Sequence, residues 1–182
     1  MKLRNLFAAS SFAAVALLLS SVSLAASKAE IDQRVHITMR QFYHLNPQHK
    51  DLVARAKGVL VFPRVTKGGI GVSGQFGEGA LRIDGKDVAY YSLSSASVGL
   101  TLGLAKHKEV ILFMNQEVLD KFMNSAGWSI GADTGVAVLS NGGGGDYDTQ
   151  TLQRPILAFV FGEKGLIGDA SLEGTKINQL EK

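Results

Sequence analysis

A glycine-rich hexapeptide, residues 69–74 (GIGVSG), has the G-x-G-x-x-G spacing of a dinucleotide-binding turn and follows an apolar run. In such a turn the pyrophosphate rests on the free N–H groups of a helix that begins directly after the glycines. Here the chain continues with alternating apolar and small residues and with further glycines at 77 and 79. That pattern predicts a strand, so we interpret residues 69–74 as a glycine-faced strand and expect no nucleotide cofactor.

Metal chemistry would have to come from histidine or aspartate, because the chain has no cysteine. The histidines are His36, His44, His49 and His107. They form no H-E-x-x-H arrangement, and a zinc site needs three or four converging ligands. The Asp-Tyr-Asp run at 146–148 lacks the remaining ligands of a calcium loop. We therefore expect solvated helix histidines, a solvated turn at 146–148 and no metal site.

Nucleophilic or acid–base catalysis has weak support. Serines are plentiful, but none stands in a G-x-S-x-G elbow. Asp133 and Asp169 lie within apolar strand patterns and are candidates for partly buried carboxylates, which would need hydrogen-bond partners. A structural role is preferred for them over acid–base work, and the chain is predicted not to be an enzyme.

Two groups of basic residues flank predicted strands and could attract an anionic surface. These are Lys57, Arg64 and Lys67 around the first strand, and Lys106, His107 and Lys108 in the turn before residues 109–114. A basic side chain at an anionic membrane contributes about 1 kcal/mol. Attraction of this kind would be weak and sensitive to salt.

The first predicted helix, residues 28–45, carries an apolar face made of Ile31, Val35, Met39 and Phe42. Two interpretations stay open for this face. It could insert at a membrane interface and add hydrophobic energy to the basic residues. Alternatively, it seals one end of the sheet, and the mixed charges elsewhere on the helix favour this.

The remaining pattern predicts an α+β fold: a strongly curved, mostly antiparallel, glycine-rich sheet packed with two N-terminal helices and one internal helix. The second helix starts at Pro47 and stops at Gly58, and the third covers 115–123. Strands are expected at 59–62 (closed by Pro63), 70–76, 78–84, 87–93, 98–104, 108–114, 130–138, 155–161 and 166–173. Glycines facing one side, such as Gly71 and Gly99, indicate that another element lies close against the sheet.

The first 25 residues read as a secretory signal peptide. A basic start at Lys2 and Arg4 precedes an apolar run at 6–19 and small side chains at Ser23 and Ala25. We expect cleavage after Ala25, a periplasmic or secreted protein and one domain over 26–182. Without Lys2 and Arg4 the formal net charge falls from +3 to +1, which is not typical of a nucleic-acid binder.

Several ordered blocks resemble the SYLF domain, also called the YAB domain. They are residues 56–63, 67–74, 77–81, 97–103, 110–115, 129–133 and 164–174, and the resemblance spans roughly 35–177. It implies a non-catalytic lipid-binding module. Eukaryotic relatives are associated with phosphoinositides, other anionic lipids and actin filaments, whereas bacterial members are mostly exported.

Two functions follow as hypotheses. In the first, the domain binds anionic phospholipid headgroups at the periplasmic membrane surface through the turn lysines and, in one interpretation, the first helix. In the second, it is a protein-interaction scaffold for a cell-envelope partner, and lipid binding is incidental. Actin is not an expected partner in the periplasm.

Overall fold

The computed structural model describes residues 26–70, 72–98, 104–131, 134–139, 147, 149–162, 165–167 and 172–182. Its helices are α1 (Lys28–Leu45), α2 (Gln48–Arg55), α3 (Gln116–Met123) and α4 (Thr149–Leu152). Its strands are β1 (Gly58–Ile70), β2 (Val72–Ile83), β3 (Lys86–Val98), β4 (Leu104–Phe113), β5 (Trp128–Ser129), β6 (Val136–Leu139), β7 (Ile156–Gly162), β8 (Gly165–Leu166) and β9 (Lys176–Leu180).

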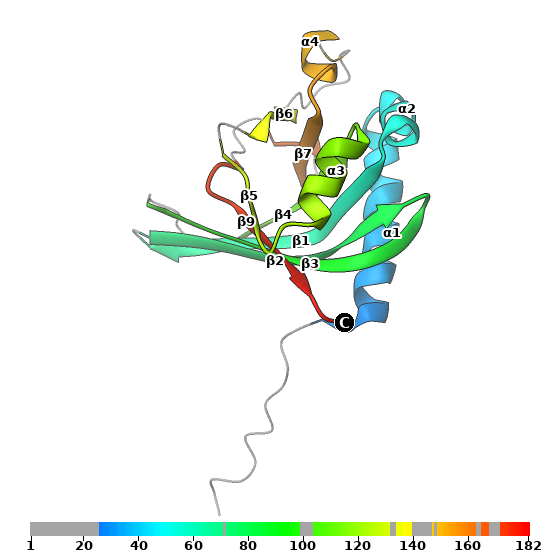
Figure 1. Ribbon diagram of the computed structural model, residues 1–182. Coiled ribbons are helices and arrows are strands. Elements are labelled where there is room, and N and C mark those ends of the chain that lie inside the picture. Colours follow the sequence, from blue (N-terminus) through cyan, green and yellow to red (C-terminus); the bar gives the residue numbers. More distant parts are fainter. Residues whose placement is uncertain are drawn as a thin grey trace, which may run out of the picture.

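The described strands form one sheet in the order β5-β9-β3-β2-β1-β4-β7-β6, and β8 pairs with β7. All of these pairs are antiparallel except β6 with β7. The sheet curls strongly, and the long strands β1, β2 and β3 run out to one side, away from α1 and α2 (Figure 1). The predicted α+β class, curved antiparallel sheet and helix positions are confirmed.

Local sequence explains where the helices begin. The Ser27 side chain accepts a hydrogen bond from the Glu30 amide at the start of α1, and Asn115 does the same for Val118 at the start of α3. The Asn46 side chain accepts from the Gln48 amide where α2 begins after Pro47. These three helices thus start beside side chains that accept hydrogen bonds from the first turn.

Two apolar layers cover the two faces of the sheet. On one face, α1 and α2 pack on alternate residues of β1, β4 and β7, such as Val61, Val110 and Phe159. On the other face, α3 packs on the intervening residues, such as Phe62 and Ile111. The sheet is therefore buried on both sides where it meets the helices.

β1 is longer than predicted. The strand does not close at Pro63 but continues to Ile70, and its pairing with β2 shifts register between Val61 and Arg64. Proline has no N–H to donate to a ladder, so it is tolerated at such a bulge. The predicted strands 70–76 and 78–84 are one strand, β2.

The hexapeptide at 69–74 divides between the end of β1 and the start of β2, where Ile70 pairs with Val72. The next described element is a strand and not a helix. The strand interpretation is confirmed, with the correction that two strands share the hexapeptide.

Other boundaries also differ. The predicted strand 130–138 is only partly confirmed: residues 136–138 belong to β6, whereas 130, 131, 134 and 135 belong to no strand, and β5 ends at Ser129 on the opposite edge of the sheet. Within 166–173 the described strand ends at Leu166. β9 and α4 were not predicted; β9 is a mostly polar strand between β5 and β3, and only Ile177 in it is buried. Residues 1–25, Gly71, 99–103, Asp133, 141–146, Asp148 and Asp169 lie outside the described residues.

Candidate functional site

The six basic residues predicted to attract an anionic surface do not lie together on one surface of the structure. Thr66 of β1 pairs with Lys106 of β4, so the two side chains lie on the same face of the sheet. Arg64 lies two residues before Thr66, and Lys108 lies two residues after Lys106, so both side chains are on this same face of the sheet. Further along β1, helix α1 covers this face. Lys57 precedes the other end of β1, about 30 Å from Lys67 at the usual rise of a strand.

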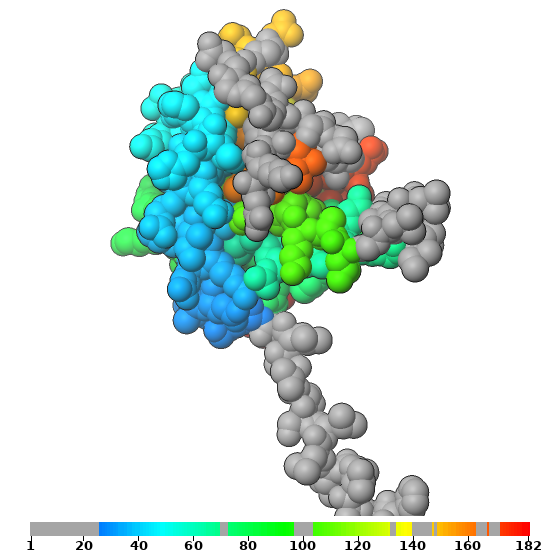
Figure 2. All heavy atoms as spheres, turned by 180° about the vertical axis from the view of Figure 1, so that it is seen from behind, coloured from blue at the N-terminus to red at the C-terminus, as the bar shows by residue number. Residues whose placement is uncertain are grey.

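Two large apolar side chains are exposed on the same face. Phe76 of β2 pairs with Thr66, and Leu104 of β4 pairs with Gly68. Their exposed fractions, 55% and 78%, are the largest of the large hydrophobic residues in the described ranges. We call Arg64, Thr66, Phe76, Leu104 and Lys106 the arm face. Figure 2 views the molecule from this side, with α1 in blue beside the exposed bright green of β4.

One carboxylate, Glu78, lies directly opposite Arg64 on the neighbouring strand. Arg64 and Lys106 have no ion-pair partner among the described residues. A cavity of about 170 Å³ separates the arm face from α1, and Arg34, Arg64, Phe76 and Glu78 are among its lining residues. Glu78 is held by Lys182 and by the Ala26 amide. The surface therefore combines open cations with exposed apolar groups.

A family comparison agrees with the resemblance seen in the sequence. Residues 94–182 match the family model Ysc84, described as Las17-binding protein actin regulator. The matched segment covers just under half of the chain and is consistent with a SYLF domain. SYLF is a family of binding domains rather than a known enzyme family, and it is associated with actin and lipid binding. No curated protein matches the chain.

His107 and Lys67 do not belong to the arm face. His107 pairs with Val65 and lies on the opposite face of β4 from Lys106. Its Nε2 is 2.8 Å from Oε1 of Glu109, whose side chain is fully buried. Lys67, two residues after Val65, faces the same way. The structure thus gives His107 a partner inside the protein.

The apolar face of α1 is buried in the core of the domain. Ile31, Val35, Met39 and Phe42 are at most 4% exposed and pack in the same cluster as Val61 and Phe159. Phe42 meets Phe159 edge to face, with ring centroids 4.9 Å apart. Of the two interpretations left open for this helix, the structure agrees with the one in which the apolar face packs against the sheet. Membrane insertion of these residues would require α1 to leave the sheet.

His49 is a buried residue that the sequence placed wrongly among solvated histidines. It is fully buried in α2, and its Nδ1 lies 2.6 Å from the carbonyl oxygen of Phe42. Its Nε2 lies 2.5 Å from the hydroxyl of Tyr147. Burial lowers the pKa of His49, and it raises the pKa of Tyr147 to about 12. The solvated turn predicted at 146–148 is therefore wrong for Tyr147, which is 6% exposed.

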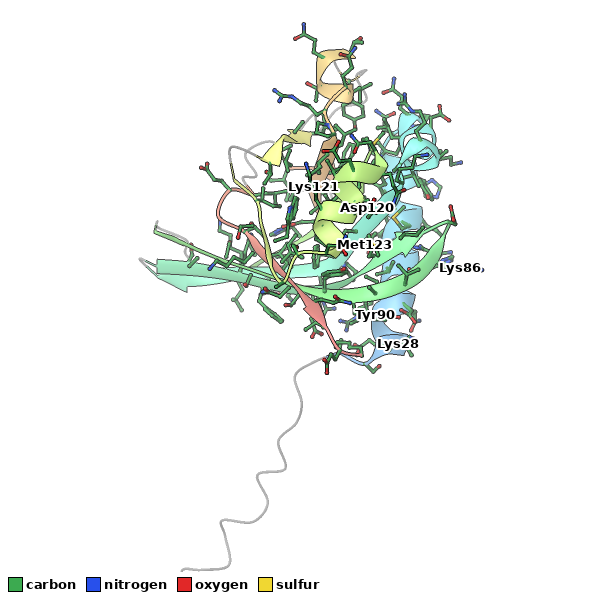
Figure 3. All side chains as sticks on the ribbon, viewed as in Figure 1. Lys28, Lys86, Tyr90, Asp120, Lys121 and Met123 are labelled. Carbon is green, nitrogen blue, oxygen red and sulfur yellow. The ribbon has the colours of Figure 1, made fainter. Side chains whose placement is uncertain are left out.

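A polar cluster joins α1 to β3 near the Asp84–Gly85 turn, at the other end of the sheet from the arm face. The Tyr90 hydroxyl donates to Oδ1 of Asp32 at 2.6 Å, and the Lys28 ammonium lies 5.4 Å from the Tyr90 ring (Figure 3). Asp32 also hydrogen-bonds Asp87, and burial raises the pKa of Asp87 against the opposing effect of Arg82.

Next to this cluster is a cavity of about 410 Å³ between α1, α2 and the start of β1. Its walls are apolar at Met39, Val53 and Val59 and basic at Arg40 and Arg82. Arg82 is already engaged: its Nε is 2.9 Å from Oδ1 of Asp87 in an ion pair without hydrogen-bond alignment. It also donates to the carbonyl of Gly85. The cluster therefore acts as a structural clamp.

The described residues provide neither a group of metal ligands nor a membrane-spanning helix. Within the described ranges, no group of three or more acidic or histidine side chains could hold a metal ion. None of the described helices has the length and apolarity needed to cross a bilayer.

Proposed function

We propose that this domain is a non-catalytic module that binds anionic phospholipid membranes through the arm face. The observation that carries the proposal is the exposure of Phe76 and Leu104 beside the cations Arg64 and Lys106, which form no ion pair with the described residues. Apolar groups that enter the headgroup region and cations that meet phosphate are the two contributions on which interfacial binding depends.

The energies suit reversible attachment. Each of the two cations contributes about 1 kcal/mol at an anionic surface. Burying the exposed parts of Phe76 and Leu104 adds about 1–2 kcal/mol each. The total of about 5 kcal/mol corresponds to a dissociation constant between micromolar and millimolar. One copy of the domain would therefore bind weakly and exchange quickly.

We place this membrane surface in the periplasm or outside the cell, on the strength of the signal-like residues 1–25. Phospholipid is then the partner, and actin is not a natural one. The lipid-binding association of the family supports the choice of ligand class.

Vesicle flotation tests the proposal. The purified protein should float with vesicles that contain acidic phospholipid and much less with neutral phosphatidylcholine vesicles. The double variant Phe76→Ser/Leu104→Ser should lose most of this binding. The matched control is Val88→Ser/Met123→Ser, which alters side chains that are 51% and 41% exposed elsewhere; Met123 is on α3 (Figure 3).

Equal, negligible flotation with both kinds of vesicle would reject the membrane proposal and leave the protein-scaffold hypothesis. Equal loss in the arm variant and the control variant would reject the arm face as the site.

A further inference from the structure

We infer that signal cleavage after Ala25 creates an α-ammonium group that docks on Glu78, so that processing adds an ion pair to the folded domain. The inference concerns Ala26, β2 and Lys182, and it is independent of lipid binding. Its starting point is the cleavage site predicted from the sequence.

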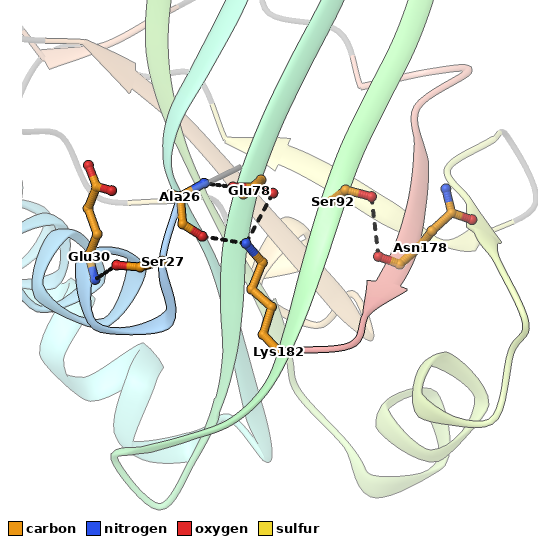
Figure 4. Close-up of polar contacts among 7 residues, drawn as sticks. All are labelled: Ala26, Ser27, Glu30, Glu78, Ser92, Asn178 and Lys182. Carbon is orange, nitrogen blue, oxygen red and sulfur yellow. Dashed lines mark hydrogen bonds and ion pairs between the residues drawn. The ribbon is translucent and has the colours of Figure 1, made fainter. Parts of the chain in front are cut away.

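The receptor for this group is already present in the structure (Figure 4). The backbone nitrogen of Ala26 lies 2.8 Å from Oε2 of Glu78. Lys182 donates from Nζ to the carbonyl oxygen of Ala26 at 2.5 Å and lies 3.3 Å from Oε1 of Glu78. The Glu78 and Lys182 side chains are each 12% exposed. One carboxylate thus accepts Ala26 on one oxygen and Lys182 on the other.

The chemistry of cleavage suits this receptor. Hydrolysis of the Ala25–Ala26 peptide bond by a signal-type peptidase adds water: the hydroxyl goes to the Ala25 carbonyl carbon, and the Ala26 nitrogen leaves with a proton. At neutral pH the new amine is mostly protonated and carries three N–H donors in place of one. A charged donor strengthens a hydrogen bond that already exists, most of all where water is largely excluded.

The position of the cut therefore matters to the fold. Cleavage one residue earlier would leave Ala26 as a neutral amide and move the charge about 3.5 Å away. Cleavage one residue later would remove Ala26 and place the new terminus on Ser27, whose side chain caps α1. Only cleavage at Ala25–Ala26 aligns the ammonium with Glu78 and ties the start of α1 to β2.

The experiment begins with the full precursor expressed in an exporting bacterium. Intact mass should show a product that begins at Ala26. Two changes are then combined: Glu78→Gln, which keeps the acceptor but removes its charge, and insertion of one alanine between Ala25 and Ala26, which makes the Ala26 nitrogen an amide again. The mass of every product confirms its first residue.

Urea unfolding at low salt measures the coupling. With Glu78 present, the extra alanine should raise the unfolding equilibrium constant about fivefold. In the Glu78→Gln background the same insertion should change it less than twofold. The matched control is Glu117→Gln, which removes the charge of an exposed glutamate that pairs with Lys121. In this background the insertion should still have its fivefold effect.

A second measurement keeps Glu78 in place, in case the Gln variant does not fold. Raising the salt concentration should destabilise the processed wild type more than the form with the extra alanine, because only the former has the added ion pair. A product that begins at any residue other than Ala26, or no processing at all, would overturn the inference. So would an insertion effect of equal size with Glu78 and with Gln at that position.

Discussion

At the scale of single residues, His49 shows what a buried titratable group does to this domain. Its two ring nitrogens are both used, one by the Phe42 carbonyl and one by Tyr147. A carbonyl only accepts, so Nδ1 carries the proton and Nε2 accepts from the Tyr147 hydroxyl. If Nε2 were protonated, its N–H and the Tyr147 O–H would be two donors facing each other. Folding therefore favours the neutral imidazole, in agreement with the lowered pKa.

This predicts acid sensitivity with a definite sign. Because the folded-state pKa is below the ordinary value, the unfolded chain binds the extra proton first as pH falls through about 6.5. The free energy of unfolding should then fall with pH, by up to about 1.4 kcal/mol per pH unit from this residue. Urea unfolding between about pH 7.5 and 5.5 measures it.

The variant His49→Gln should be less stable at the upper pH but should lose this part of the pH dependence. His44→Gln alters an exposed histidine of α1 and serves as the control, with an unchanged slope expected. An identical slope in wild type and His49→Gln would show that His49 does not titrate on unfolding.

The sequence could not reveal this network. Tyr147 is 98 positions from His49 and follows a run of four glycines, which gives no periodic signal. α2 is only 8 residues long, too short for its buried face to be recognised from spacing alone. Contacts of such long range depend on the tertiary fold.

At the scale of elements, the glycines of β2 determine how tightly it packs on the bulge of β1. A Cβ at Gly79 would lie 2.0 Å from the carbonyl oxygen of Val61, and one at Gly77 would lie 2.9 Å from that of Arg64. These are backbone atoms on either side of the register shift. The close approach at these two positions is between neighbouring strands of the sheet, whereas Gly71 and Gly99, at which another element was expected to lie close, are outside the described residues.

We predict that Gly79→Ala destabilises the domain by about 3 kcal/mol, because the neighbouring backbone cannot move aside as a flexible side chain would. Gly74→Ala, on the same strand, should change stability by less than about 0.5 kcal/mol, because its nearest atom would be 3.7 Å from the new Cβ. Thermal unfolding of both variants measures the difference. Similar melting temperatures would contradict the close-approach account.

Element type was more predictable than element boundaries. Alternation in β2, β3 and β4 and the capped apolar faces of α1 and α3 gave the right secondary structure. The bulge at Pro63 was missed, because a proline usually ends a strand. β9 was missed because its stability comes from pairing with β3 and not from an apolar pattern of its own.

At the scale of the whole molecule, the net charge gives no indication of the proposed membrane-binding site. Outside residues 1–25 the formal charge is only +1, yet Arg64 and Lys106 lie on one face, and neither forms an ion pair with another described residue. Sequence reasoning found these cations but grouped them with Lys57 and His107, which the fold places elsewhere. Alternation also identified Phe76 and Leu104 as strand residues without showing that they are exposed.

The arrangement predicts how vesicle binding should respond to salt. Arg64→Gln/Lys106→Gln should lower the preference for acidic vesicles about thirtyfold, because two contributions of about 1 kcal/mol are lost, and it should flatten the salt dependence. Lys86→Gln/Lys121→Gln removes the same number of charges at the two sites labelled in Figure 3 and should behave like wild type. Equal salt dependence in the two variants would mean that charge acts without regard to position.

The junction of Ala26, Glu78 and Lys182 also has a consequence for the order of folding. β9 completes its pairing with β3 only once the last residues have been synthesised, and Lys182 then meets the first described residue of the chain. A ribosome-bound chain that still lacks these residues has a bare edge on β3 and an untethered α1. Native structure should therefore form only after residues 176–182 have been synthesised and can pair, which makes folding of this domain a late step in its synthesis.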